Sequence, residues 1–426
     1  MSAPGTPPLV TCLGCGLACD DLAVREDGPR LAAPDIACAM GAAWVASAEV
    51  PWQVLVDGRP ADAGAALDRA AALLGDARGR LLVAIGGDLT TDAIRAAVAV
   101  ADVGGAVVET LTSAAAAEGL LAAQRRGRAA ATLGEVRNRA DVLVYWGCDP
   151  ARTHPRFAGR IAPLPLGTQV PEGRAGRVLV AVAVGADSAP RDADLRLDLA
   201  PADEVAALGA MRAAADGRMI GGLAGPVAAA AALVERLAAA RYVAIVHDAE
   251  ASLEPARDPG RAEALIALAQ ALNGPTRAAL VTLRGGGNRA GAEAVLTWQT
   301  GYPFAVDFAG GVPRYRPARR GRERLADGHV AAALVAGDWR ALDAGLVAGL
   351  RGVRCVAIGP GASAAPFAPA VAIDTGRAGL HEDGTVYRMD DVPLPARAPL
   401  AAPRRAAELL GRLAQALAAA PAGRPA

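Results

Sequence analysis

Four cysteines near the start of the chain are the residues best suited to chemistry. They are Cys12, Cys15, Cys19 and Cys38, separated by two, three and eighteen residues. Thiolates gathered from a short segment suit a soft metal, and the uneven spacing of the first three is more typical of iron–sulfur loops than of zinc knuckles. We expect an iron–sulfur site here; a structural zinc with the same ligands and a thiol loop that binds nothing are the alternatives.

The other reactive residue types give weaker indications. Cys148 follows an apolar run and Cys355 lies inside one, which indicates buried small apolar side chains rather than nucleophiles. His154 adjoins a proline, a context typical of a structural hydrogen-bonding residue. The segment 285–291 holds three consecutive glycines, whose bare N–H groups can approach a phosphate or a pterin diphosphate, although the spacing is not GxGxxG.

Apolar runs that alternate with amphipathic stretches must position these residues. The alternation predicts an α/β fold with several layers and mostly parallel sheets, preceded by a small cysteine-rich segment. Gly and Asp follow several of the expected strands, as in ligand-facing loops at the carboxyl edge of a parallel sheet. The expected strands are 80–87, 106–110, 142–146, 242–247, 278–283, 332–335 and 353–358, and the expected helices are 61–75, 91–100, 114–125, 261–272 and 406–418.

The chain of 426 residues is long enough for several domains. We expect four consecutive parts. Residues 1–55 form the iron–sulfur-type segment, 56–200 a first α/β domain, 201–360 a second α/β domain, and 361–426 a terminal segment with one helix.

Charge and hydropathy exclude several classes of function. Forty-four basic and forty-four acidic residues leave a net charge of zero, which predicts no general attraction to nucleic acid or to an anionic membrane. The N-terminus lacks the pattern of a secretory signal, and the alanine-rich runs are too short to cross a bilayer. A cytoplasmic protein is expected, with no nucleic acid or membrane as partner.

Several segments together resemble the family of formylmethanofuran dehydrogenase B subunits, a branch of the molybdopterin oxidoreductases. The segments are 12–21, 37–41, 132–156, 284–308 and 384–390. The resemblance spans the chain and implies a molybdopterin-oxidoreductase-like fold. It also implies that Cys12, Cys15, Cys19 and Cys38 are the ligands of a [4Fe–4S] cluster.

One departure from this family concerns its metal centre. Catalytic members of the family carry a cysteine or selenocysteine, followed by His-Gly-Pro, that binds molybdenum or tungsten. The corresponding segment here places Ala115 at the metal ligand and Ala116 at the histidine. No cysteine or histidine lies between Met40 and Cys148, so shifting the alignment restores neither residue. A methyl group can neither bind such a metal nor relay a proton.

The resemblance therefore favours the B subunits of the bacterial formyltransferase/hydrolase complexes of methylotrophs. It implies a non-catalytic structural subunit in one-carbon metabolism from formaldehyde to formate, linked to tetrahydromethanopterin and methanofuran. The implied partners are a formyltransferase subunit, an amidohydrolase-like subunit and, through the complex, a methanofuran-type carrier. A molybdopterin or tungstopterin is expected to be absent.

Two other interpretations stay open. The first is a formylmethanofuran dehydrogenase that interconverts formylmethanofuran and carbon dioxide on a molybdenum or tungsten pterin, with its metal ligand drawn from elsewhere, for example Cys148. The second is a small-molecule binding module that retains an emptied pterin cleft, lined by the glycine loops at 285–287 and 359–361.

Overall fold

A computed structural model describes residues 8–28, 30–32, 36, 38–186, 189–249 and 257–420. The chain folds as two compact units. The first comprises Met1–Thr112 and Gly285–Ala426, and the second is Ser113–Arg284. Each unit has its own sheet and its own apolar core.

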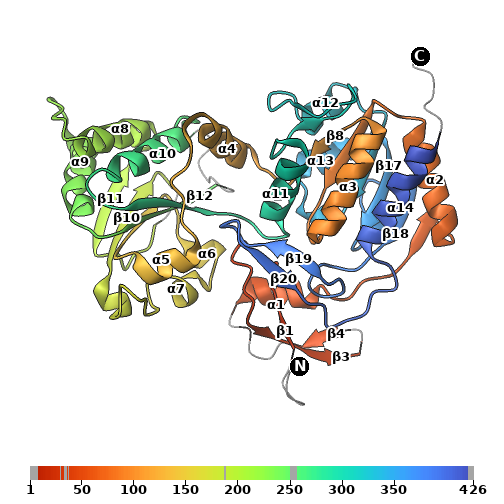
Figure 1. The fold of residues 1–426 in the computed structure, drawn as a ribbon, viewed down its shortest axis with the longest axis horizontal. Helices are drawn as coiled ribbons and strands as arrows, with labels where there is room; N and C mark the ends of the chain where they lie inside the picture. Colours follow the sequence, from red (N-terminus) through yellow and green to blue (C-terminus); the bar gives the residue numbers. More distant parts are fainter. Residues whose placement is uncertain are drawn as a thin grey trace. The chain divides into compact units, whose positions relative to one another are not determined.

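The second unit is built on a five-stranded parallel sheet in the order β11-β10-β9-β12-β13. The residues of β9 and β12 are almost entirely apolar and buried, because helices cover both faces of the sheet. Figure 1 shows α8, α9 and α10 on one side of this sheet and α5, α6 and α7 on the other. The strands are β9 (Val142–Trp146), β10 (Val178–Val184), β11 (Leu195–Leu199), β12 (Val243–Asp248) and β13 (Ala278–Leu283). The helices are α4 (Ala114–Arg126), α5 (Leu133–Arg139), α6 (Pro150–Thr153), α7 (Phe157–Arg160), α8 (Glu204–Ala215), α9 (Gly225–Ala238) and α10 (Arg261–Leu272).

The first unit is built on a nine-stranded sheet in the order β15-β14-β8-β7-β16-β17-β18-β5-β6. Its five central strands are parallel, and an antiparallel pair closes each edge. The sheet strands are β5 (Val54–Val56), β6 (Arg59–Pro60), β7 (Leu81–Ile85), β8 (Ala106–Glu109), β14 (Val306–Asp307), β15 (Arg314–Tyr315), β16 (Ala332–Ala336), β17 (Arg354–Gly359) and β18 (Val371–Asp374).

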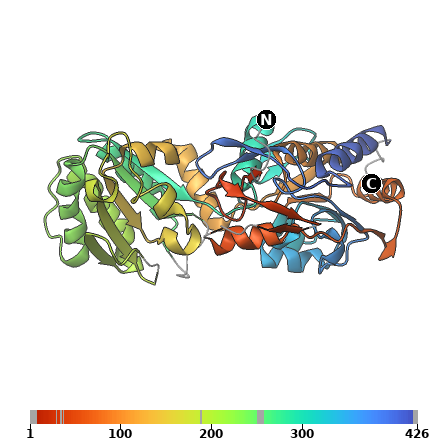
Figure 2. The ribbon, with the colours of Figure 1, turned by 90° about the horizontal axis from the view of Figure 1, so that it is seen from below.

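Successive residues of the central strands supply two separate apolar layers. In β7, Leu81, Val83 and Ile85 pack against α2, α3 and α14, whereas Leu82 and Ala84 pack against the layer that contains α13. Figure 2 shows α3 (orange) and α14 (dark blue) on one side of the sheet and α13 (light blue) on the other. The helices of this unit are α1 (Ala39–Ala46), α2 (Ala63–Gly75), α3 (Thr91–Gly104), α11 (Arg289–Thr300), α12 (Gly321–Ala326), α13 (Ala344–Leu350) and α14 (Ala406–Ala419).

Three small two-stranded sheets complete the first unit. They are β1 (Leu9–Val10) with β2 (Leu22–Ala23), β3 (Arg25–Asp27) with β4 (Arg30–Ala32), and β19 (Gly384–Tyr387) with β20 (Pro393–Ala396). Three of the N-terminal cysteines lie on the loop between β1 and β2, and the fourth, Cys38, immediately precedes α1. This confirms the expected α/β fold with mostly parallel sheets and a small cysteine-rich N-terminal segment. Within the ranges that the structure describes, no helix has both the length and the apolar character needed to cross a membrane.

The observed division of the chain differs from the four consecutive parts that the sequence suggested. The strand at 142–146 was expected in the first α/β domain, but it is the central strand of the second unit, between β10 and β12. Conversely, β16 and β17 were expected in the second α/β domain, but β16 pairs with β7. The physical reason is long-range strand pairing, which returns the chain to its first sheet after Arg284 and which no local pattern encodes.

The helix α14 offers a test of how the first unit is stabilised. Leu413 is fully buried on the face that packs against α3 and α2, so Leu413→Ala should lower the free energy of unfolding by about 2–5 kcal/mol. Gln415→Ala, on the exposed face of the same helix, is the matched control and should change stability little. Urea unfolding followed by circular dichroism measures both, and equal stabilities of the two variants would contradict this packing.

Candidate functional site

The first three cysteines lie on the loop that joins β1 to β2. The backbone N–H of Cys12 donates to the carbonyl of Cys19 at 2.9 Å, which closes the loop, and the N–H of Ala18 donates to the carbonyl of Cys15 at 3.3 Å. The side chains of these three cysteines are buried. Cys38 is the N-cap residue of α1 and is partly exposed.

Two glycines allow the loop and α1 to pack closely around the Cys12 thiol. A Cβ added at Gly14 would lie 2.6 Å from the carbonyl oxygen of Met40 and 3.4 Å from the Cys12 sulfur. A Cβ added at Gly41 would lie 3.8 Å from the same sulfur. The N–H of Gly14 also donates to Cys12 Sγ at 3.3 Å, a bond that would favour a thiolate.

The four thiols lie close enough to interact electrostatically. Burial, together with repulsion from Cys15, Cys19 and Cys38, raises the pKa of Cys12 to about 12 against the lowering effect of the Gly14 hydrogen bond. Within the described residues, no three or more His, Cys, Asp or Glu side chains are arranged to hold a metal ion. The donor chemistry therefore suits a cluster or zinc, whereas the arrangement of the sulfurs is not that of a formed metal site.

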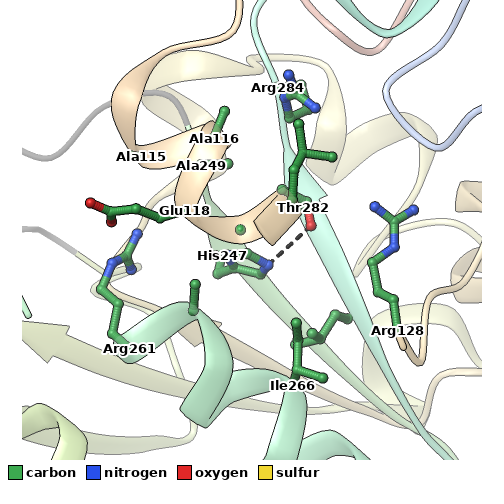
Figure 3. A pocket seen from close by; sticks show the side chains of 14 residues that line it. Ala115, Ala116, Glu118, Arg128, His247, Ala249, Arg261, Ile266, Thr282 and Arg284 are labelled. Carbon is green, nitrogen blue, oxygen red and sulfur yellow. Dashed lines mark hydrogen bonds between the residues drawn. The ribbon is translucent and has the colours of Figure 1, made fainter. Parts of the chain in front are cut away.

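The second candidate site is a small cavity in the second unit, beside the first turns of α4. Ala115, Ala116 and Glu118 of α4 line one wall, and His247 and Thr282 lie at the carboxyl ends of β12 and β13 (Figure 3). Three arginines complete the polar part of the lining: Arg128, Arg261 and Arg284. The cavity thus lies where the family resemblance places the metal ligand, Ala115, and its neighbouring histidine, Ala116.

His247 is neutral in this environment. Its ring is buried, and burial together with the positive charges of Arg261, Arg128 and Arg257 lowers its pKa to about 3. Its Nε2 lies 3.0 Å from the hydroxyl oxygen of Thr282. The cavity wall therefore combines guanidinium charge with an uncharged imidazole.

This cavity does not fit a thiolate-bound molybdenum or tungsten pterin. None of its lining residues carries sulfur, although soft thiolate is the donor that the family uses. Its volume is about 50 Å³, which holds roughly three to five water molecules, whereas sites for larger ligands span about 300–1,000 Å³. The side chains present there thus support no step through such a cofactor.

A larger cavity, of about 670 Å³, lies in the first unit at the carboxyl edge of its sheet. Gly87 follows β7 and Asp338 follows β16, and between these two strands the order of the sheet reverses, which is where α/β proteins place ligands. Gly286 and Gly287 of the predicted glycine loop also line this cavity. The loop therefore lies at a ligand-sized opening, as the sequence suggested.

One arginine fixes the strand ends at this cavity. The Nη1 atom of Arg377 donates to Asp88 and, at 2.7 Å, to Asp338, and all three residues are buried. Its Nε donates to the carbonyl of Ser47 at 2.9 Å. The guanidinium thus joins the ends of β7 and β16 to the segment after α1.

The structural roles expected for three other residues are confirmed. Cys148 is buried and its thiol donates to the carbonyl of Val246 at 3.3 Å. Cys355 is buried and its thiol donates to the carbonyl of Leu350 at 3.3 Å. His154 is buried, with Nε2 2.9 Å from the carbonyl oxygen of Arg284.

His247, Thr282 and the arginines of the small cavity were not predicted from the sequence. His247 and Thr282 stand at the ends of two expected strands, so the carboxyl-edge rule could have selected them. Arg128 and Arg261 carry no such signal, because one lies on a loop and the other begins a helix. Arg261 reaches the cavity because α10 packs on β13, and Arg128 because the neighbouring Ala129 carbonyl accepts the N–H of Leu280 in β13 at 2.7 Å.

The depressed pKa of His247 makes a testable prediction. Between pH 6.5 and about 3 the unfolded chain binds a proton at this residue and the folded chain does not, so acid should destabilise the fold in this range. In an NMR titration, the His247 resonance, assigned with His247→Gln, should show no step near pH 6.5. A midpoint there would contradict the buried, cation-flanked environment. Just below pH 6.5, the free energy of unfolding of the His247→Gln variant should also decrease less steeply with falling pH than that of the wild-type chain.

Comparisons with known proteins identify the family. No family model matches the sequence. The B subunit of the tungsten-containing formylmethanofuran dehydrogenase 2 of Methanocaldococcus jannaschii is 31% identical over 405 residues, which cover 91% of this chain and 92% of that protein. The protein of the same name from Methanococcus maripaludis is 28% identical, with coverages of 92% and 94%.

A crystal structure gives a consistent result. It is the formyltransferase/hydrolase complex (FhcABCD) from Methylorubrum extorquens in complex with methylofuran. One of its chains superposes with a TM-score of 0.71 at 26% identity, covering 85% of this chain and 98% of that chain. With its fold, its cysteine segment and its nearly full-length match to the archaeal proteins, this chain belongs to the family of formylmethanofuran dehydrogenase B subunits.

Proposed function

We propose that this chain is a non-catalytic structural subunit of a formyltransferase/hydrolase complex. The observation that carries the proposal is Ala115. At the position where the resemblance expects a metal-binding thiolate, α4 presents a methyl group to a small cavity lined without sulfur. A polypeptide of this family without that ligand keeps the fold and loses the centre at which a one-carbon unit would be oxidised or reduced.

The remaining sulfur atoms give no substitute ligand. Cys148 was the candidate replacement, but its thiol is used in a hydrogen bond to Val246 and does not line the cavity. Burial raises its pKa well above the usual value, which disfavours the thiolate that a metal requires. These observations favour the structural subunit over a dehydrogenase that draws its ligand from Cys148.

The partners follow from the complex in which the structural neighbour occurs. That neighbour belongs to a formyltransferase/hydrolase complex with methylofuran, and this chain covers 98% of it. Our proposal assigns formyl transfer and hydrolysis to a formyltransferase subunit and an amidohydrolase-like subunit. This chain would hold them in register around a methanofuran-type carrier, in metabolism from formaldehyde to formate. We place the assembly in the cytoplasm, because none of the six cysteines is paired in a disulfide.

The N-terminal cysteines are proposed to hold a [4Fe–4S] cluster that stabilises the segment. Cys12, Cys15 and Cys19 come from the β1–β2 loop and Cys38 from the start of α1, so one cluster would cross-link the two elements. The tight approach at Gly14 and the N–H donated to Cys12 Sγ support this assignment. When bound, such a cluster supplies four iron–thiolate bonds, and here their role would be structural.

Assembly tests the proposed function. We expect the tagged full-length chain, co-expressed with formyltransferase and hydrolase subunits, to recover both in a fixed ratio with formyl transfer and hydrolysis intact. Ala115→Ser should leave both rates within about twofold, because this residue contacts no reacting atom in the proposal. Failure of the wild-type chain to bind either partner, or a large loss of rate in the variant, would contradict a structural role.

Iron content tests the cluster. We expect anaerobically purified chain to contain four iron atoms per chain, as a [4Fe–4S] cluster requires, with the absorbance of an iron–sulfur centre. Cys12→Ser combined with Cys15→Ser should abolish the iron and lower the melting temperature. Cys355→Ala, which removes a buried thiol elsewhere in the same unit, is the control and should keep the iron. Zinc in place of iron would contradict the cluster and support a structural zinc site. A chain with neither metal would show that the cysteine loop binds no metal.

A further inference from the structure

The loop at residues 161–177 of the second unit exposes two leucines. Leu164 has 58% of its surface exposed and Leu166 has 66%, whereas most leucines of the chain are buried. The neighbours Ile161 and Val170 on the same loop are buried. The loop therefore buries two of its apolar side chains and exposes the two leucines. An exposed apolar group rimmed by polar residues is typical of an interaction site.

A buried arginine holds this loop in place. Arg177 is only 3% exposed, and its guanidinium donates to two carbonyl oxygens of the loop and to two at the end of α5. The acceptors are Ala140 at 3.1 Å, Pro163 at 2.7 Å, Pro165 at 2.6 Å and Arg137 at 2.7 Å. Four hydrogen bonds from a charged donor tie the loop to the end of α5. Pro163 and Pro165, which flank Leu164, are thus fixed directly.

Two glycines let the loop close on itself. Gly167 and Val170 exchange backbone hydrogen bonds of 3.0 and 3.1 Å. A Cβ at Gly167 would lie 2.2 Å from the carbonyl oxygen of Arg137, so only glycine fits there. Gly173 has a φ of +59°, and a Cβ added to it would lie only 3.1 Å from a methyl carbon of Leu166. The leucines are therefore presented by a preorganised backbone, which reduces the entropy that a partner must overcome on binding.

The rim of the loop is basic. The segment 132–177 contains seven arginines and four acidic residues. Some of these charges are used locally: Arg139 pairs with Glu135 and Arg174 with Asp194, Arg177 is buried, Asp141 pairs with Arg241 and Asp149 caps α6. The remaining four arginines outnumber the one remaining acid, Glu172, which is exposed on the loop itself. Arg137 and Arg152, from α5 and α6, are among the exposed arginines of the segment. Such a rim complements a partner surface rich in Asp and Glu.

We propose that the 161–177 loop is a docking surface for another protein subunit, one whose surface offers an apolar socket for Leu164 and Leu166 ringed by carboxylates. The inference rests on the proposed function, since it assigns the surface through which a structural subunit holds an enzymatic partner. A second copy of this chain fits less well, because a symmetric contact would place the arginine rim against itself.

The test compares two pairs of exposed apolar residues on one unit. Leu164→Asp with Leu166→Asp alters the docking surface. Met219→Asp with Ile220→Asp alters a glycine-rich loop elsewhere on the unit, where the exposed fractions are 100% and 45%. Full-length wild-type and variant chains are titrated against the formyltransferase and hydrolase subunits in biolayer interferometry. We expect the first variant to bind one of these partners at least tenfold more weakly, and the second variant to change less than twofold. Binding should weaken with added salt, and Arg137→Glu should weaken it too.

Each outcome separates this inference from the proposed function. If the wild-type chain binds neither partner, the proposed function fails. If the wild-type chain binds and both double variants bind equally well, the function stands and the docking surface is wrong. Loss of a wild-type homodimer in light scattering, or of wild-type binding to anionic vesicles, in the Leu164/Leu166 variant alone would also overturn the inference, in favour of self-association or a membrane. If circular dichroism shows that the aspartate pair does not fold, Leu164→Ser with Leu166→Ser takes its place under the same criteria.

Discussion

A methyl group has no lone pair, and this limits what α4 can offer at Ala115. The helix begins at the carboxyl edge of a parallel sheet, a position from which a thiolate could reach a metal. Here the side chains at its start are those of Ala115 and Ala116, and the cavity beside them is lined by guanidinium groups and a neutral His247. The fold does not require the missing ligand, because the strands of the sheet are stabilised by apolar burial on both faces. The fold can therefore persist in a chain without a thiolate at this position, as the proposed structural role requires.

The two units have cavities in corresponding places, at the carboxyl edges of their sheets, but the cavities differ in volume. Each places glycines or polar residues where parallel strands end, and each has a cavity there. In the first unit the cavity is large, and Arg377 fixes its base by pairing with Asp88 and Asp338. In the second unit the cavity is small and cationic. The structural role proposed for this chain uses neither cavity for chemistry. It depends instead on surfaces that contact partner subunits, such as the proposed docking surface at the 161–177 loop.

Much of the fold could be predicted from local sequence pattern. The strands at 142–146 and 278–283 and the helix at 261–272 were expected with the bounds that they have, because uninterrupted apolar runs and helical periodicity reflect burial directly. The return of the chain to its first sheet could not be predicted, since the pairing of β16 with β7 joins segments about 250 residues apart. The strand β10 was missed, although its valine-rich run is as clear as that of β9.

The candidate site residues were predictable only where local sequence pattern marks them. The cysteine spacing predicted four thiols that would act together, and the structure places these thiols close enough to interact, yet the sulfur arrangement depends on packing between the β1–β2 loop and α1. His247, Arg128 and Arg261 converge only when α10 and the segment after α4 have packed against the sheet. Arg177 looks like any other arginine in the sequence, and its four carbonyl partners belong to loops whose course is set by tertiary structure.

The most direct test of the central claim is the molybdenum and tungsten content of the complex purified through this chain, measured by mass spectrometry together with formate-dependent dye reduction. The account predicts neither metal in stoichiometric amount and no dye reduction, while formyl transfer and hydrolysis proceed. One tungsten or molybdenum per chain, with formate reducing the dye, would contradict it.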